Sequence, residues 1–170
     1  MKLRKLKMKD APFMLEWMHD EDVVRNMKAN FMKKTLDDCE EFIKNSEISN
    51  FYHRAIVNDQ DEYMGTVSLK NIDRIRQCAE FAITIRKSAM GKGYSAYGMQ
   101  EIISEGFELL HLKYIYWYVR KENMRAIKFY EKMGYKHLGR DTLKKLGIQN
   151  REIEDKDLIW YGAEAETGQK

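Results

Sequence analysis

The chain has 170 residues, of which 44% are hydrophobic and 34% are charged, and its formal net charge is +3. This length predicts one domain with a sizeable core. The net charge is too small for a dedicated nucleic-acid binder, although it suits a local basic pocket for a phosphorylated small molecule. No apolar run approaches the roughly 20 residues that a membrane-spanning helix requires. Cys39 and Cys78 form no motif and no signal peptide is visible, so we expect a reduced, cytoplasmic protein without nucleic-acid or membrane partners.

The N-terminal residues 2–8 predict a strand, because leucine and methionine alternate loosely with lysine. Asp10 then predicts the N-cap of a helix that has Pro12 in its first turn. Apolar residues at steps of three and four predict further helices at 35–45, from near 93 to about 110, and at 123–133. Further strands are predicted at 51–58, 63–69, 78–85, 113–120, 135–138 and 158–161.

This mixture of strands and helices predicts an α+β fold. In the strand at 78–85, alternation places Phe81 and Ile83 on one face and Glu80 on the other. In the strand that follows, the tyrosines of 114–118 share one face, which is ordinary for a half-buried strand. No repeat, linker or change of composition divides the chain. We therefore expect one domain over residues 1–163 and a disordered tail at 164–170.

The stretch AMGKGYSAYGMQ, Ala89–Gln100, joins a predicted strand to a predicted helix through Gly91 and Gly93. The first amides of a helix have no partners within it, and together with the helix dipole they form an anion site. Glycines permit positive φ and let a pyrophosphate approach the main chain, and Lys92 adds a cation. The alternative is a plain left-handed turn without a ligand. Neither the P-loop pattern nor the dinucleotide-binding pattern is present.

A second block, VRKENMRAIKFYEKMGYKHLG (Val119–Gly139), favours the ligand-binding alternative. Together with MGKGYS it resembles the signature of the GNAT superfamily of acetyl-CoA-dependent N-acyltransferases. The first block departs from the family pattern at Met90, where a polar residue is usual, and at Ser95, the small last position. The resemblance runs from about Ala79 to Gly139. It implies a single-domain GNAT-like fold, in which helices flank a mixed, mostly antiparallel twisted sheet.

The resemblance also implies acetyl-CoA as the co-substrate and no metal ion. The implied pyrophosphate-binding residues are those of the glycine turn: Met90, Gly91, Lys92, Gly93, Tyr94 and Ser95. On the preceding strand, three residues would hydrogen-bond the pantetheine arm through their main chain: Ile83, Thr84 and Ile85. Asn123, Ala126 and Tyr130 would contact the same cofactor from the next helix, and Asn123 could also cap that helix.

Acyl transfer from a thioester to an amine requires proton transfer at both the attacking amine and the leaving thiolate. A free alkylamine has a pKa of roughly 10.4 and is mostly protonated at neutral pH, so a proton must be removed from it and another supplied to the leaving thiolate. The resemblance places Tyr130 near the thioester sulfur as the general acid; a core tyrosine is the alternative. Glu80, a carboxylate in an apolar strand, is the candidate base, directly or through a water. An ion pair on the sheet face is its alternative role.

The stretch MLEWMHDEDVVRNM, Met14–Met27, bears on the acceptor. It resembles the branch that contains ribosomal-protein N-terminal acetyltransferases, and amino-sugar-nucleotide acetyltransferases share a similar segment. Its carboxylates could attract a cationic acceptor, or could form a solvated helix end: Glu16, Asp20, Glu21 and Asp22. We expect direct transfer of an acetyl group to a primary amine, either of a small molecule (a polyamine, an aminoglycoside or an amino-sugar nucleotide) or of a protein N-terminus. The alternative function is a catalytically silent CoA-binding module.

The four histidines have no metal-ligand spacing, so no metal site is expected. His53 alternates along a predicted strand and could line the acceptor pocket or be a satisfied structural histidine. The sequence leaves open the acceptor, the identity of the base, the pathway and the oligomeric state, with a homodimer among the options.

Overall fold

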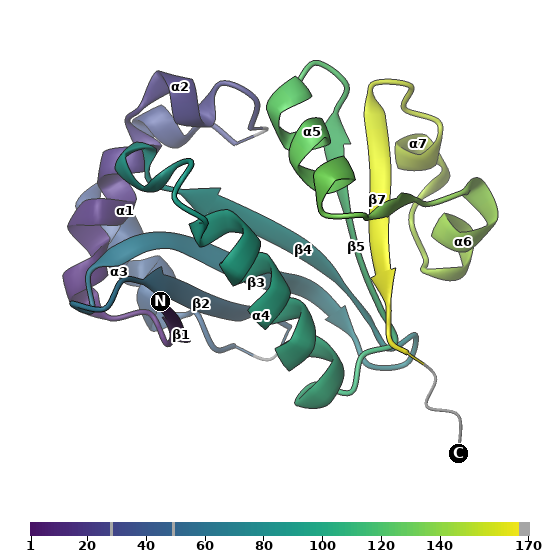
Figure 1. Ribbon diagram of the computed structural model, residues 1–170, viewed down its shortest axis with the longest axis horizontal. Coiled ribbons are helices and arrows are strands. Elements are labelled where there is room, and N and C mark those ends of the chain that lie inside the picture. Colours follow the sequence, from purple (N-terminus) through teal and green to yellow (C-terminus); the bar gives the residue numbers. More distant parts are fainter. Residues whose placement is uncertain (28, 49, 167–170) are drawn as a thin grey trace.

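Within the described residues a seven-stranded sheet organises the fold (Figure 1). The structure, a computed structural model, describes residues 1–27, 29–48 and 50–166. Across the sheet the strands are β1 (Lys2–Arg4), β2 (Tyr52–Val57), β3 (Tyr63–Asp73), β4 (Cys78–Ile85), β5 (Tyr114–Arg120), β7 (Leu158–Glu164) and β6 (Lys136–His137). Only the β4–β5 pair is parallel. The predicted α+β class and mostly antiparallel sheet are confirmed.

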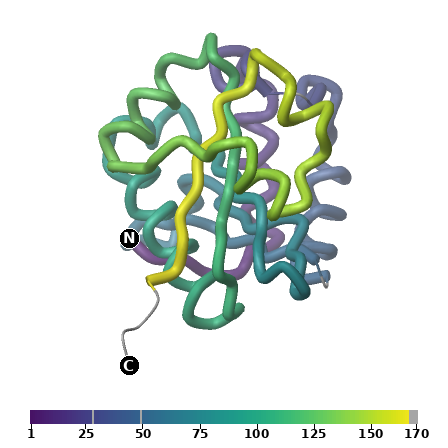
Figure 2. The backbone as a smooth tube through the Cα atoms, turned by 90° about the vertical axis from the view of Figure 1, so that its right-hand side faces the viewer, coloured from purple at the N-terminus to yellow at the C-terminus, as the bar shows by residue number. Residues whose placement is uncertain are grey.

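Helices cover both faces of this sheet. They are α1 (Ala11–Met18), α2 (Glu21–Val24), α3 (Leu36–Lys44), α4 (Tyr94–Glu108), α5 (Met124–Lys132), α6 (Arg140–Lys145) and α7 (Asn150–Ile153), with single 3₁₀ turns η1 (Met8–Asp10), η2 (Phe31–Lys33) and η3 (Lys87–Ala89). Figure 1 shows α4 crossing the near face of the sheet, with α1 and α3 at its far side. In Figure 2, α5 lies on one side of β5 and β7, and the α6–α7 segment lies on the other. No helix in the described residues is both long and apolar enough to span a membrane.

The strand alternation sorts side chains between separate hydrophobic clusters. On β5, Ile115, Trp117 and Val119 join the main core beneath α4 and α5, whereas Tyr116 packs with the α6–α7 side. The predicted alternation of the aromatic strand is therefore confirmed. A third cluster joins α1 and α3 to β2 and β3.

The role predicted for Asp10 is wrong, although its position at the start of α1 is right. Its carboxylate makes no capping hydrogen bond to α1. Instead it is 1% exposed and accepts hydrogen bonds from both terminal nitrogens of Arg4, at 2.7 and 2.8 Å, and from the Lys7 amide, at 2.8 Å. A buried carboxylate is strongly favoured when a guanidinium pairs with it in this two-pronged geometry, so Asp10 ties α1 to β1.

The predicted end of the folded domain also needs correction. Strand β7 continues to Glu164, which pairs with Tyr114 of β5, and the Ala165 amide donates to the Lys113 carbonyl at 2.9 Å. The ladder continues because β5 offers a free edge there. Residues 167–170 of the predicted tail lie outside the described residues. Helices α6 and α7 occupy a stretch in which no element was predicted.

Candidate active site

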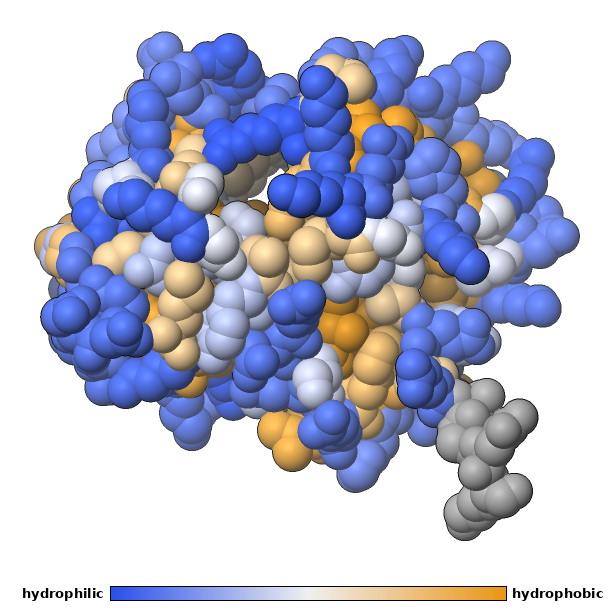
Figure 3. All heavy atoms as spheres, in the orientation of Figure 1, coloured by the Kyte–Doolittle hydropathy of each residue, from blue (hydrophilic) through white to orange (hydrophobic). Residues whose placement is uncertain are grey.

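The sheet splits between β4 and β5. Their pairing ends at Glu80 and Tyr116, yet β4 stays paired with β3 as far as Ile85, and β5 stays paired with β7 as far as Arg120. Beyond Glu80 the two strands therefore diverge, as Figure 1 shows. In Figure 3 the surface is hollowed between the loop that follows β4 and helix α5. The split leaves one edge of β4 without a strand partner.

The hydrogen-bonding alternation of β4 shows which groups face this split. The Arg86 amide donates to the Met64 carbonyl at 2.9 Å, in the register of the antiparallel β3–β4 pair. Because every second residue of such a pair faces its partner, the main-chain groups of Thr84 also face β3. Those of Ile83 and Ile85 face the split. The prediction that Thr84 hydrogen-bonds a ligand through its main chain is thus not supported, whereas Ile83 and Ile85 are suitably placed.

The glycine turn after β4 has the backbone of an anion site. Gly91 and Gly93 have φ of 74° and 87°, and Gly93 is the N-cap of α4 without a side-chain cap. Within the described chain, the amides of residues 91–96 donate to no other backbone carbonyl. A β-carbon built on Gly91 would meet no atom within 4 Å. Free amides, open space and a helix N-terminus together fit a pyrophosphate.

The other predicted residues of the turn lie around these amides. Lys92 is exposed, and Ser95 is partly buried in the first turn of α4. Met90 and Tyr94 pack against the main core, which anchors the turn on both sides of the glycines. The apolar side chain of Met90, unusual for the family pattern, therefore serves packing here.

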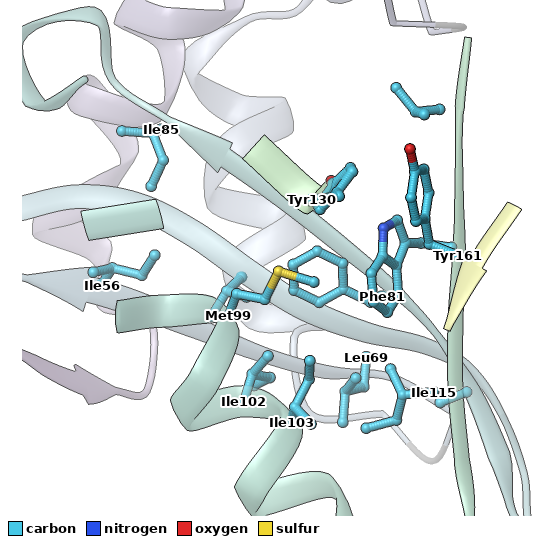
Figure 4. Packing of buried hydrophobic residues seen from close by; sticks show 14 of the residues in the cluster. Ile56, Leu69, Phe81, Ile85, Met99, Ile102, Ile103, Ile115, Tyr130 and Tyr161 are labelled. Carbon is cyan, nitrogen blue, oxygen red and sulfur yellow. The ribbon is translucent and has the colours of Figure 1, made fainter. Parts of the chain in front are cut away.

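Tyr130 of α5 stands where β4 and β5 separate. It is 8% exposed, and its ring centroid lies 5.4 Å from that of Trp117 and 5.2 Å from that of Tyr161 (Figure 4). Burial, and then the neighbouring phenols of Tyr161 and Tyr135, raise the pKa of Tyr130 above its ordinary value. Its hydroxyl therefore carries a proton at neutral pH, as a general acid must.

Asn123 begins α5 and performs the capping role that its sequence position allowed. Its side-chain oxygen accepts a hydrogen bond from the Ala126 amide at 3.2 Å. The side-chain NH₂ group keeps two donors for other contacts. Capping and cofactor contact are compatible, because they use opposite ends of the amide.

Glu80 occupies the last paired position before the split, and both of its oxygens accept hydrogen bonds. Lys70 donates to one at 3.0 Å and Asn71 to the other at 3.0 Å. The side chain is 17% exposed. This is the ion pair on the sheet face that the sequence left as an alternative, and the role of base stays a prediction.

The acidic segment of α1 and α2 is largely paired with the two residues that follow β4. Arg86 donates to both oxygens of Glu16, at 3.0 and 2.8 Å, and to Glu62 at 2.9 Å. Lys87 contacts Asp22 at 2.8 Å and Asp20 at 3.5 Å. These residues connect α1 and α2 to the glycine turn. Sequence reasoning missed Arg86, which is 7% exposed, because its partners lie 24 and 70 residues away.

His53 is a structural residue. It is 5% exposed, its Nδ1 lies 2.6 Å from the Ser68 hydroxyl, and its ring contacts Phe42 and Phe51. Burial, followed by the charges of Lys70 and Arg54, lowers the pKa of His53 to about 4. These contacts support the structural role that the sequence left as one alternative.

A cavity of about 620 Å³ lies elsewhere, between β6, β7 and α6. None of the residues predicted for the site lines it. We place the candidate site at the split because the unpaired amides of the turn, the free edge of β4 and Tyr130 all border that split.

Comparisons with known proteins agree with this geometry. Residues 1–136 match the family described as the acetyltransferase (GNAT) domain. A spermidine N(1)-acetyltransferase of Vibrio cholerae is 30% identical over 125 residues, which cover 71% of this chain and 72% of that protein. A spermidine N(1)-acetyltransferase of Escherichia coli K12 is 35% identical over 82 residues, which cover 48% of this chain and 44% of that protein.

Solved structures show the same fold. Spermidine N-acetyltransferase from Vibrio cholerae in complex with CoA and spermine has a TM-score of 0.73 at 26% identity, covering 81% of this chain and 82% of that one. A dodecameric structure of the Vibrio cholerae enzyme in an intermediate state has a TM-score of 0.71 at 24% identity, covering 96% and 92%. From the matched domain, the shared fold and the divided sheet, the chain belongs to the GNAT acetyltransferase family and is an acetyl-CoA-dependent N-acetyltransferase.

Proposed function

We propose that this enzyme acetylates a primary amine of a polyamine. The observation that carries the proposal is the relative from Vibrio cholerae, a spermidine N(1)-acetyltransferase that is 30% identical over 71% of this chain. The structure adds less support than the sequence suggested, because Glu16, Asp20 and Asp22 already form ion pairs with Arg86 or Lys87. In the described chain Glu21 makes no ion pair, and it remains able to attract a cationic acceptor.

For the co-substrate, we propose that the amides of residues 91–96 bind the pyrophosphate and that Lys92 contributes charge at its rim. The main chain of Ile83 and Ile85 would pair with the pantetheine arm as an added strand does. Asn123 would contribute a donor from the start of α5. When bound, acetyl-CoA supplies the acyl thioester; the residues of this chain orient it and move protons.

Tyr130 is the proposed general acid. Its buried phenol keeps a proton at neutral pH and would donate it to the sulfur as the carbon–sulfur bond breaks. Glu80 is the proposed proton acceptor on the amine side, acting through a water. A carboxylate offers about four lone-pair sites, of which Lys70 and Asn71 use two, so a water can still bind to it.

Release of free thiol from acetyl-CoA, measured over a panel of amines, tests the acceptor. We expect spermidine and spermine to be turned over with a kcat/KM at least about tenfold above that of a peptide with a free N-terminus or of an amino-sugar nucleotide, which corresponds to roughly 1.4 kcal/mol of discrimination. Preferential turnover of the peptide or the amino sugar would contradict the proposed acceptor and leave the family assignment intact.

The Tyr130→Phe variant tests the acid. Loss of a general acid lowers kcat by about 10²–10⁴-fold, while CoA affinity measured by calorimetry should stay within about twofold because the ring is retained. Tyr135→Phe is the matched control, since Tyr135 also packs against Trp117, at a centroid distance of 4.9 Å. Full activity of Tyr130→Phe would remove the proposed role.

A further inference from the structure

Arg86 is the residue at which the chain leaves β4 and heads toward the glycine turn. Its amide donates to the Met64 carbonyl of β3 at 2.9 Å, and its carbonyl accepts a hydrogen bond from the Ala89 amide at 3.0 Å, which closes η3. Ala89 is 1% exposed and packs in the main core. Met90 alone then separates η3 from Gly91. The glycine turn thus starts from a residue whose main chain is bonded to the sheet.

The side chain of Arg86 is held by two other segments. Nε and Nη2 donate to the two oxygens of Glu16 in α1, at 3.0 and 2.8 Å. Nη1 donates to Glu62 at 2.9 Å and to the Tyr63 carbonyl at 3.0 Å. The guanidinium carbon also lies 4.4 Å from the ring centroid of Phe13. A planar guanidinium bound at this many points has a fixed orientation, so it fixes its own main chain relative to α1 and the start of β3.

These contacts leave Arg86 little capacity to bind a phosphate itself. Its four hydrogen bonds to the protein use most of the five guanidinium N–H groups. Two carboxylates, Glu16 and Glu62, also face its single positive charge. A buried ion pair is weak evidence for stability, because desolvation offsets much of its attraction. What the paired guanidinium does supply is orientation.

We propose that Arg86 is a positioning residue for the pyrophosphate-binding amides of the glycine turn. Its side chain sets where the chain leaves the sheet, and η3 carries that placement to the amides of residues 91–96. In the described chain those amides donate to no backbone carbonyl, so the segments on either side must hold them in place. This inference rests on the proposed binding of pyrophosphate by the turn.

The Arg86→Lys variant tests this inference, because lysine keeps the charge and loses the planar set of donors. Arg4→Lys is the matched control: the Arg4 side chain is 10% exposed against 9% for Arg86. Arg4 also pairs with two carboxylates, those of Asp10 and Asp61, at 2.7 and 2.6 Å.

We expect the calorimetric Kd for CoA to rise about tenfold or more in Arg86→Lys, because misplacing a preorganised group by about 1 Å has effects of at least this order. In Arg4→Lys it should stay within about twofold, the usual error of additivity between separate sites. A Kd for CoA that is unchanged in Arg86→Lys would overturn the inference.

A comparison of acetyl donors separates positioning from general damage. S-acetylpantetheine has the thioester but no pyrophosphate, so the ratio of kcat/KM for acetyl-CoA to that for S-acetylpantetheine measures what the nucleotide half contributes. Arg86→Lys should lower this ratio about tenfold and raise the KM for acetyl-CoA with little change in kcat. An equal loss with both donors would contradict positioning. A ratio near one in the wild type would show instead that the turn does not bind pyrophosphate, and the inference would fail with that assignment.

The Glu16→Ala variant keeps the inference testable if Arg86→Lys does not fold. The Glu16 side chain is 48% exposed in α1, where alanine is well tolerated. Removal of a carboxylate favours the binding of an anion such as CoA through the long-range field of the protein. Loss of the hydrogen bonds that orient Arg86 should have the opposite effect, and we expect the Kd for CoA to rise about fivefold, as for one net hydrogen bond. A Kd equal to or below that of the wild type would overturn the inference.

Discussion

Among single side chains, location rather than burial separates the ionisable groups that serve the fold from those that serve the site. His53 and Tyr130 are both nearly inaccessible. The ring of His53 hydrogen-bonds the Ser68 hydroxyl and packs against two phenylalanines, so the core favours its neutral form. Tyr130 instead borders the split between the strands. The same physical effect, the cost of burying a charge, therefore has a structural consequence at one residue and a chemical consequence at the other.

The buried histidine makes stability depend on pH. Burial lowers the pKa of His53 to about 4 from an ordinary 6.5, so between these values the unfolded chain binds the proton that the folded protein excludes. This contribution is complete above pH 6.5 and is lost as the pH falls toward 4. We expect the free energy of unfolding, measured with urea, to be about 2 kcal/mol lower at pH 5 than at pH 7.

His53→Gln should remove most of that pH dependence, whereas His137→Gln, which changes an exposed histidine, should retain it. The same loss between pH 7 and pH 5 in wild type and His53→Gln would show that other groups are responsible.

Among the elements, the first turn of α4 depends most on backbone conformation. Gly93 has φ of 87°, and a β-carbon there would meet only the Met1 Cε, at 3.8 Å. Space is therefore not the constraint; the left-handed conformation is. Gly98, farther along the same helix, has a different reason: its β-carbon would lie 2.3 Å from Ile56 Cδ1, so glycine there permits α4 to approach the sheet.

We expect Gly93→Ala to destabilise the protein by about 1–2 kcal/mol, the usual cost of a left-handed alanine. Relaxation of that strain would also move the amides of the turn and weaken CoA binding. Gly139→Ala is the matched control, because φ at Gly139 is −78° and nothing lies within 4 Å of its β-carbon. Urea unfolding and calorimetry measure the two effects. Identical behaviour of both variants would mean that the turn tolerates a side chain.

Across the molecule, the sheet consists of two parts that meet at three register pairs between β4 and β5. The proposed pantetheine and pyrophosphate contacts come from β4 and the turn after it, and Tyr130 comes from α5 on the other side of the split. A ligand that contacts both parts can bind the folded protein but not the unfolded chain, and it therefore stabilises the folded state. The stabilisation then follows from mass action.

We therefore expect CoA at about 100 times its Kd to add about 2.7 kcal/mol to the free energy of unfolding. Differential scanning calorimetry over a series of CoA concentrations measures it as a rising thermal midpoint. Pantetheine, which lacks the pyrophosphate, should give a smaller shift at the same concentration. A thermal midpoint that is unchanged by CoA would contradict the assignment of the turn.

Local patterns in the sequence sufficed for features whose causes lie within a few residues. The bounds of β4, the left-handed glycines of the turn, the capping role of Asn123 and the sidedness of β5 all depend on periodicity and on backbone sterics. The contiguous motif around Tyr130 was also enough to propose this residue as the acid, a role that stays a prediction. The same approach failed for Asp10, whose partner Arg4 offered a stronger hydrogen bond than the helix did.

Other features of the site depend on contacts between distant segments. The split exists because β4 and β5 keep separate antiparallel partners after Glu80, and no residue of β4 encodes that alone. The ion pairs that hold Glu80, Glu16 and Asp22 arise only once the strands are side by side. Helix starts, turns and the alternation of side chains follow from short-range sterics, and so the local sequence alone determines them. Pairing, burial and the cleft follow from long-range packing, which is known only when the sheet order is known.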